Sequence, residues 1–240
     1  MIRCKICKGG MAMQARLTAI NENEVLKYLG YLGGEIPADV MASIHAGMDT
    51  ILHTARPRAC WRTFTLQREG ETLAVQEAAL TLPGADIQTL LKDCHECVIL
   101  CATLGAEVEA LLRRTQLTNL SQAVILDACA SSAIENVCDH VQEDVAAAYP
   151  EYYLTDRFSP GYGDMPITVQ PRLCAAMDTA RQIGLTVSQS GILIPRKSVT
   201  AIIGLANVPQ TLRFRGCEHC RMFKTCNLRK EGRSCGKETV

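Results

Sequence analysis

The longest segment with apolar residues at regular helical spacing runs from residue 119 to residue 149. Apolar or small side chains recur there every three or four positions, as at Val124, Ala128, Cys138 and Val145, and Glu135 falls on the same broad face. This spacing is that of one face of an α-helix, so the pattern predicts a single long helix. Its residues 128–133 are mostly alanine and serine, which would let another backbone approach closely.

Shorter helices are predicted on both sides of this segment. Asn21 can cap a helix because its side chain accepts from backbone N–H groups of the first turn, and Pro37 suits the first turn of the next helix. The predicted helices cover residues 22–29, 37–54, 86–93, 106–114 and 170–183.

Runs rich in β-branched and apolar residues predict five strands. Two of them would form a hairpin around the turn at residues 68–71, and the run CVILCATLG would be a buried strand. The predicted strands cover residues 59–67, 72–81, 97–105, 185–194 and 198–206.

Length and charge narrow the function classes. The chain has 240 residues, which fits one large domain or one domain with a small appendage. Its 25 basic residues balance 25 acidic ones, which argues against bulk nucleic-acid binding. No uncharged apolar run is long enough to span a membrane, so we expect no membrane insertion.

The neutral total conceals an uneven distribution of charge. Residues 211–240 contain eight Lys and Arg against three Glu, a net charge of +5, so the rest of the chain carries −5. We therefore expect a leader at 1–17, a globular domain at 18–208 and a basic, cysteine-rich tail at 209–240.

The chain has 13 cysteines, an odd count, and no secretory signal. Both features argue against a disulfide framework and favour a reducing, cytoplasmic location. Four cysteines cluster in the tail, where a Cys-x-x-Cys pair lets two thiolates reach one metal ion. The candidate ligands of a zinc ion or an iron–sulfur cluster are Cys217, Cys220, Cys226 and Cys235, with His219 as a further candidate. The spacing matches neither common ferredoxin pattern, so the metal stays open, and idle thiols in a tail are the alternative.

The other cysteines favour different interpretations. Cys94-His95-Glu96-Cys97 with Cys101 could form a metal or redox site, but its apolar surroundings favour buried core thiols. Cys4 and Cys7 are either additional ligands or without function. The remaining four, which lie in patterns typical of a core, are predicted to pack: Cys60, Cys129, Cys138 and Cys174.

The segment RFSPGYGD at residues 157–164 carries the most promising chemistry. Its glycines allow backbone amides to face a ligand, and Arg157 offers a planar fork for a carboxylate. Tyr162 adds an aromatic face, and Glu151 could hold an ammonium group, so the set suits a zwitterion with a flat ring. An ordinary surface loop is the alternative. Likewise Arg196 and Lys197 could meet a phosphate or carboxylate, or form a solvated turn.

These segments together resemble a known family. The loop RFSPGYGD, the run LTVSQSGILIPRKSVTAIIG, the helix LDACASSAIENVCDH and the stretch LCATLG look like the S-adenosylmethionine-binding activation domain of cobalamin-dependent methionine synthase. The resemblance covers residues 18–208 and is strongest to the stand-alone form of that domain. It implies an α+β fold, with a twisted, mainly antiparallel sheet and flanking helices.

The resemblance also implies a function and a site. The function is activation of methionine synthase, in which S-adenosylmethionine and one electron remethylate oxidised cobalamin held by a partner subunit, with flavodoxin or ferredoxin as the electron donor. This chain lacks the DxHxxG pattern that ligates cobalamin. The residues that correspond to the family's S-adenosylmethionine contacts are Glu135, Glu151, Arg157, Ser159, Gly161 and Tyr162. The family's late tyrosine and N-terminal aspartate have no clear counterpart in this sequence. An iron–sulfur activator of another corrinoid methyltransferase, and a non-catalytic docking subunit, are the alternative functions.

Overall fold

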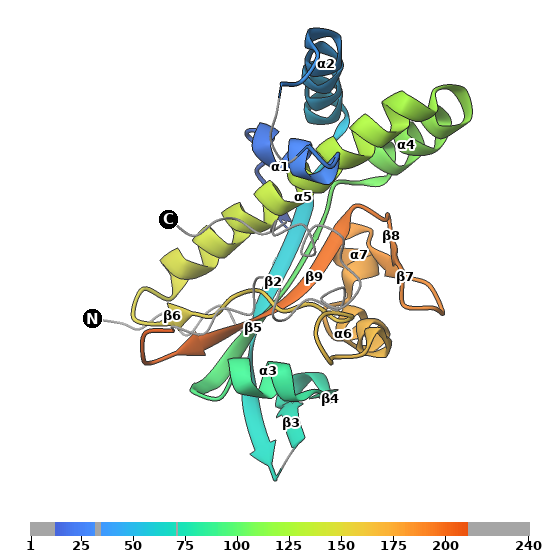
Figure 1. Ribbon diagram of the computed structural model, residues 1–240. Helices are drawn as coiled ribbons and strands as arrows, with labels where there is room; N and C mark the ends of the chain where they lie inside the picture. Colours follow the sequence, from blue (N-terminus) through green and yellow to red (C-terminus); the bar gives the residue numbers. More distant parts are fainter. Residues whose placement is uncertain (1–12, 32–34, 71, 211–240) are drawn as a thin grey trace.

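One antiparallel sheet forms the centre of the molecule (Figure 1). The structure is a computed structural model that describes residues 13–31, 35–70 and 72–210. Within these residues the sheet has seven strands in the order β4-β3-β2-β5-β9-β6, with β1 also paired to β2. The strands are β1 (Met13–Gln14), β2 (Arg58–Glu69), β3 (Thr72–Val75), β4 (Leu80–Leu82), β5 (Cys94–Thr103), β6 (Tyr153–Leu154) and β9 (Ser198–Ala206).

Helices cover both faces of this sheet, and each face has its own hydrophobic core. Val98 and Leu100 of β5 contribute to one core, whereas Ile99 and Cys101 contribute to the other. A strand buried on both faces needs apolar residues at every position, which explains the uninterrupted run in β5. The α+β fold with a mainly antiparallel sheet is therefore confirmed.

The helices divide between the faces as Figure 1 shows, with α5 along one face and α3, α6 and α7 near the other. The helices α1, α2 and α4 pack against α5 rather than directly on the sheet. Their bounds are α1 (Glu22–Tyr28), α2 (Ala38–Thr54), α3 (Ala85–Leu90), α4 (Ala106–Thr118), α5 (Leu120–Ala148), α6 (Gln170–Ala176) and α7 (Thr179–Ile183), and short 3-10 turns lie at Gln76–Ala78 and Ile167–Val169. No helix of the described segments is long and apolar enough to cross a membrane.

The predicted close approach to α5 occurs at α2. A Cβ atom added to Gly47 of α2 would lie 2.9 Å from Ile125 Cγ2 and 3.4 Å from Cys129 Sγ. The Cys129 thiol in turn lies 3.9 Å from the carbonyl oxygen of Ile44. The missing side chain of Gly47 in α2 permits this approach, and Cys129 is the residue of the predicted segment 128–133 that takes part in it.

Three predicted elements are broken in the structure. The predicted strand 72–81 is β3, a 3-10 turn and β4, because Ala79 adopts a left-handed φ of 46°. The predicted helix 170–183 is two helices, since Asp178 has φ 49°. The predicted strand 185–194 is a small hairpin of β7 (Thr186–Val187) and β8 (Leu193–Ile194).

The predicted leader is not wholly separate from the domain. Met13 and Gln14 pair with Ala59 and Arg58 of β2, so the chain joins the sheet before residue 18. Ala15 is buried in the core beneath α5. Residues 1–12 and the tail 211–240, with all six of their cysteines, lie outside the described residues.

Candidate functional site

The segment that begins at Arg157 is fixed to the sheet by backbone pairing. Phe158 and Ile202 of β9 exchange N–H···O bonds of 2.9 and 2.8 Å. The Phe158 ring is buried in the core beside α3 and α6. Because successive side chains of an extended chain point to opposite faces, Arg157 is directed to the face that α5 covers.

Three acceptors on α5 hold the Arg157 guanidinium. Its Nη1 donates to Asp139 Oδ1 at 2.8 Å and to Gln142 Oε1 at 3.0 Å, and its Nη2 donates to Glu135 Oε2 at 2.9 Å. These partners recur at helical spacing along one stripe of α5. The Arg157 side chain is 12% exposed, whereas those of Glu135 and Asp139 are 38% and 48% exposed. Burial by itself would lower the pKa of Arg157, but neighbouring anionic groups outweigh it and raise that pKa.

A second basic side chain, that of Lys197, contacts α5 closer to the N-terminus of the helix. Lys197 Nζ lies 3.0 Å from Asp127 Oδ1 and 2.7 Å from Ser131 Oγ, and its side chain is 15% exposed. The solvated-turn alternative is therefore wrong for Lys197, and its charge is already engaged by α5. Along one polar stripe of α5, Lys197 contacts the residues nearer the N-terminus and Arg157 contacts those further along, beginning with Glu135.

The glycine-containing loop satisfies its own backbone groups. The amide of Gly161 donates to the Met165 carbonyl at 2.9 Å, and the amide of Tyr162 donates to the Ser159 carbonyl at 3.0 Å. The expectation that these amides face a ligand is thus wrong for Gly161, whose N–H bonds inside the loop. The Tyr162 ring packs edge-on against Phe158, with centroids 5.6 Å apart, and remains 37% exposed.

Two aspartates tie this loop to the start of α3. Asp164 Oδ2 accepts from the amide of Ala85 at 2.6 Å, and Asp164 Oδ1 accepts from the amide of Asp86 at 3.2 Å. In return, Asp86 Oδ2 accepts from the Asp164 amide at 3.3 Å. Gly163 lies against this pair, since an added Cβ would be 2.4 Å from Asp86 Oδ2. The loop is therefore held at both ends, by β9 and by α3.

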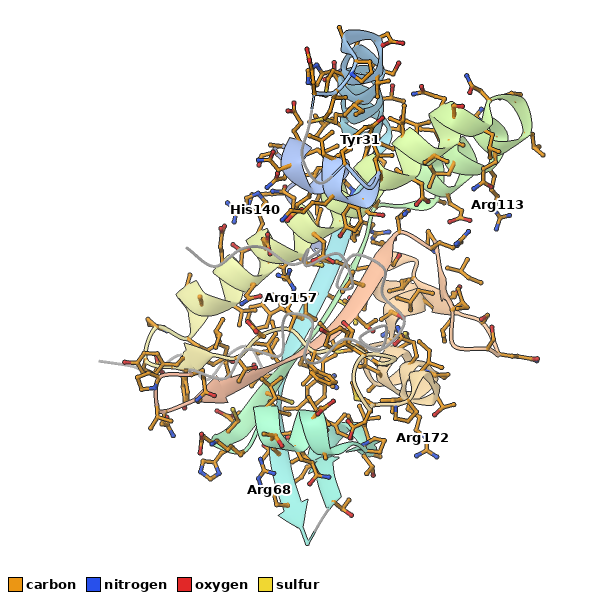
Figure 2. All side chains as sticks on the ribbon, viewed as in Figure 1. Tyr31, Arg68, Arg113, His140, Arg157 and Arg172 are labelled. Carbon is orange, nitrogen blue, oxygen red and sulfur yellow. The ribbon has the colours of Figure 1, made fainter. Side chains whose placement is uncertain are left out.

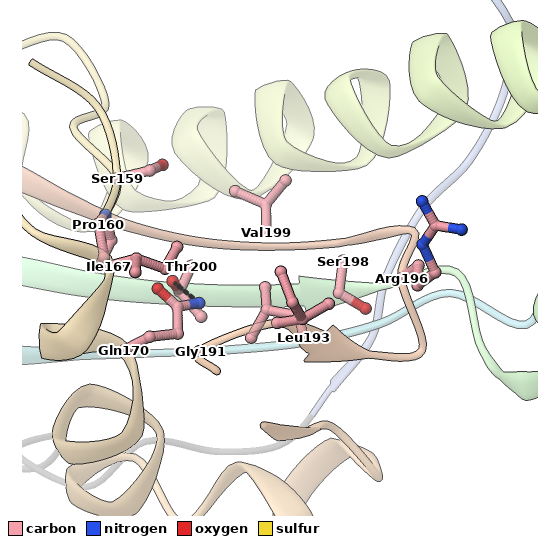
Figure 3. Close-up of a pocket in the computed structure, with 11 residues that line it drawn as sticks. Ser159, Pro160, Ile167, Gln170, Gly191, Leu193, Arg196, Ser198, Val199 and Thr200 are labelled. Atoms are coloured by element: carbon pink, nitrogen blue, oxygen red, sulfur yellow. Dashed lines mark hydrogen bonds between the residues drawn. The ribbon is translucent and has the colours of Figure 1, made fainter. Parts of the chain in front are cut away.

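A cleft of about 280 Å³ opens beside the loop (Figure 3). Figure 3 shows Ser159 and Val199 on one side of strand β9 and Gln170, Thr200 and Leu193 on the other. Two polar residues of the cleft lining are joined by a buried hydrogen bond, in which Gln170 Nε2 donates to Thr200 Oγ1 at 2.7 Å. The residues lining it are Ser159, Pro160, Ile167, Gln170, Gly191, Ile192, Leu193, Arg196, Ser198, Val199 and Thr200. Its volume is at the lower limit for sites that bury a small organic molecule.

The structure brings together most of the predicted site residues. Arg157 and Glu135 form an ion pair, Figure 2 shows Arg157 beside α5, and Ser159 lines the cleft. Glu151 lies apart, in the exposed turn before β6. That strand pairs with Leu205 and Ala206, at the opposite end of β9 from the cleft.

Sequence reasoning missed several residues at this site. Asp139 and Gln142 follow Glu135 at helical spacing, so the helix pattern could have indicated them once Arg157 was placed on that face. Gln170 and Thr200 carried no comparable signal, because their contact joins residues 30 positions apart.

All seven described cysteines are buried, which confirms the prediction that they pack in the core. Burial raises the pKa of Cys94 to about 11, as it does for Cys129, so both are protonated and unreactive near neutral pH. Among the described residues no group of three or more His, Cys, Asp or Glu side chains could hold a metal ion. Cys4, Cys7 and the predicted metal ligands of the tail lie outside those residues.

Comparison with known proteins supports the fold. No family model matches the chain, and no curated protein matches it by sequence. Among solved structures, the chain is similar to the MetH reactivation domain bound to AdoHcy, with a TM-score of 0.62 and 14% identity. The match covers 95% of this chain and 87% of the other. At that identity the likeness establishes a shared fold and nothing further.

Proposed function

We propose that this protein binds S-adenosylmethionine and acts as the activation component of a cobalamin-dependent methionine synthase. The Arg157–Glu135 pair carries the proposal, because Arg157 lies two residues before Ser159 of the cleft lining. It places one cation and one anion 2.9 Å apart. The methionine half of the ligand bears its carboxylate and ammonium on a single carbon, so a side-by-side pair of opposite charges complements it. The shared fold with a domain that was solved with AdoHcy adds support.

The residues would bind and orient the ligand. Arg157 would meet the ligand carboxylate, and Glu135 the ammonium, with Glu151 as the other candidate for that group. Ser159 and the loop around Gly161 would border the ligand, and the exposed ring of Tyr162 offers a stacking face. The reaction adds one electron and the sulfonium methyl group to cob(II)alamin on the partner, giving methylcobalamin and S-adenosylhomocysteine. It requires no acid or base from this chain, so the chain contributes positioning.

The proposed partners are a separate cobalamin-binding subunit of methionine synthase and an electron donor such as flavodoxin or ferredoxin. The proposal is tested by titrating the purified chain with AdoHcy in a calorimeter, and then by supplying S-adenosylmethionine, reductant and the cob(II)alamin-loaded subunit. We expect saturable one-site binding and formation of methylcobalamin only when this chain is present. Binding without methylation would favour a different corrinoid partner, and absence of binding would favour a docking subunit.

The tail supports the second candidate function, a redox activator of another corrinoid methyltransferase. Its four clustered cysteines lie among cations, which favour the thiolate form that metals bind. We propose that Cys217, Cys220, Cys226 and Cys235 bind zinc or an iron–sulfur cluster. Protein purified without oxygen should contain metal in proportion to chain, with visible absorption if the metal is iron–sulfur. A colourless, metal-free preparation would contradict this assignment.

A further inference from the structure

Two buried thiols face each other across neighbouring strands on the side of the sheet away from α5. Cys60 of β2 is paired directly with Cys101 of β5 in the antiparallel register, and both side chains are buried in the same core. Directly opposite residues of an antiparallel pair have Cα atoms about 4.5–5.5 Å apart. A disulfide requires a Cα separation of about 4.4–6.8 Å, so the backbone already meets this condition.

A small pocket reaches one of these thiols, whose exposed fraction is 1%. Cys60 contributes to the lining of a cavity of about 140 Å³, together with Arg62 and Arg181. Arg62 is fixed there, because its guanidinium donates to the Ala176 carbonyl at 3.1 Å and lies 4.2 Å from the centre of the Phe64 ring. The opening carries two guanidinium groups and one carboxylate, since Arg181 pairs with Asp178 at 2.7 Å, and the remaining positive charge favours reagents that carry carboxylates. Cys101 lies behind Cys60, on the central strand, and is fully buried.

The pKa values of the two thiols are shifted in opposite directions, as thiol–disulfide exchange with Cys60 as the attacking group requires. The hydrogen bond with Cys101 lowers the pKa of Cys60, and Arg62 lowers it further against the opposing effect of burial. Burial and the neighbouring thiols raise the pKa of Cys101. Cys60 lines the pocket and Cys101 does not, so Cys60 is the group that meets a reagent first and attacks as the thiolate.

We propose that Cys60 and Cys101 form a redox-active dithiol that low-molecular-weight, carboxylate-bearing disulfides oxidise to a cross-strand disulfide. The Cys60 thiolate, having lost its proton to water, attacks one sulfur of the reagent and expels a thiolate, which leaves a mixed disulfide on Cys60. Cys101 then loses its proton and attacks the Cys60 sulfur, expelling the second thiolate. Two protein thiols are oxidised, the reagent is reduced to two thiols, and the two protons restore both leaving groups.

The dithiol lies one strand away from the candidate cleft. Cys101 is paired across the sheet with Thr200, which accepts the hydrogen bond from Gln170 in the cleft. Cys174 follows one turn after Gln170 on α6, and its negative form would raise the pKa of Cys101, so the same helix borders both features. A disulfide at this position would join β2 to the strand beside the cleft wall.

The chain offers a matched control for this chemistry. Cys97 lies on the same strand and in the same core as Cys101, but its partners across the sheet are Phe64 and Gly204. It is equally buried and has no thiol opposite. Cys97→Ser therefore perturbs the core comparably without removing the proposed disulfide.

The experiment treats the folded, full-length chain with oxidised glutathione, blocks the remaining thiols with iodoacetamide and maps tryptic peptides without reduction. We expect residues 59–62 to be joined to residues 93–113 in the wild type and in Cys97→Ser. In Cys101→Ser we expect that product to be lost and Cys60 to retain glutathione. Hydroxyethyl disulfide, which lacks carboxylates, should react more slowly than oxidised glutathione.

Two outcomes would overturn the proposal: Cys60 remaining unmodified in the folded wild type, or Cys60 pairing with a cysteine other than Cys101. If a serine variant fails to fold by circular dichroism, the alanine variant replaces it, and fragment masses of the joined wild-type peptide identify which of Cys94, Cys97 and Cys101 is bonded to Cys60. The assay contains no S-adenosylmethionine or corrinoid, so its result is independent of the proposed function.

Discussion

Replacing Arg157 with alanine should weaken the binding of AdoHcy about tenfold to a hundredfold, because a hydrogen-bonded ion pair to a ligand carboxylate contributes roughly 1.5–3 kcal/mol. The guanidinium is 12% exposed and held by three acceptors on α5, so it is oriented before the ligand arrives. Preorganisation of this kind reduces the entropic cost of binding. Isothermal titration of the purified variant measures the loss. Arg157→Lys should recover little of it, since an ammonium group cannot form the two-pronged contact of a guanidinium.

Arg16→Ala provides the matched control for this experiment. Arg16 also forms an ion pair with α5, at 2.8 Å from Asp144 Oδ1, but its side chain is 57% exposed, against 12% for Arg157. We expect its removal to leave AdoHcy affinity unchanged, because an exposed pair contributes little. Thermal melts of both variants separate lost binding from lost folding. An Arg157→Ala protein that stays folded and binds AdoHcy as tightly as wild type would remove the central site assignment.

The two candidate acids for the ligand ammonium are distinguished in the same titration. Glu135 contacts Arg157 directly, whereas Glu151 is exposed in a turn at the other end of β9 from the cleft. Glu135→Gln should therefore weaken binding, and Glu151→Gln should not. The reverse ranking would show that the ligand's amino acid portion lies nearer the turn before β6 than the present geometry indicates.

Sequence patterns predicted some elements far better than others. The helix expected at 119–149 is Leu120–Ala148, because many turns of apolar periodicity define its face. The strand expected at 185–194 is wrong because its apolar residues hide a tight turn. There the Ser188 hydroxyl accepts from the Ile192 amide, and Gly191 adopts a φ of 83°. The serine and glycine at 188–191 were a turn signal that alternation of apolar residues outweighed.

At the site, too, residues within one short segment could be recognised from the sequence, whereas contacts between distant segments could not. Arg157 and Tyr162 were singled out from a short loop by residue type. Glu135 was a candidate only through the family resemblance, and its contact with Arg157 was not predicted, since no pattern along one chain links residues 22 positions apart. Asp86 and Asp164 each donate a backbone amide to the carboxylate of the other across 78 positions, and neither residue carried any signal of this contact. Such contacts depend on how the strands are ordered, which periodicity does not specify.

Gly204 should be the position least tolerant of a side chain in the described sheet. It lies on β9 opposite Cys97, and an added Cβ would be 2.5 Å from Cys94 Sγ, 2.6 Å from Leu91 Cδ2 and 2.9 Å from Thr155 Cγ2. Thr155 is fixed as well, because its hydroxyl accepts from the Gly204 amide at 2.8 Å. Overpacking of a core usually costs about 1–3 kcal/mol. We therefore expect Gly204→Ala to lower the free energy of unfolding by that amount, measured in urea.

A second substitution tests whether the Cys94 side chain causes this crowding. The nearest obstructing atom is the Cys94 sulfur, so Cys94→Ala should relieve part of the strain in the Gly204→Ala background. By itself, Cys94→Ala removes a buried sulfur and should destabilise the protein. The double variant should therefore be more stable than the sum of the two single losses predicts, which is the signature of two residues in contact. Strict additivity would mean that the added methyl group is accommodated elsewhere, by movement of Leu91 or of the segment that carries Thr155. Movement of the segment that carries Thr155 would also displace Arg157, which lies two residues further along the chain. AdoHcy affinity would then fall together with stability.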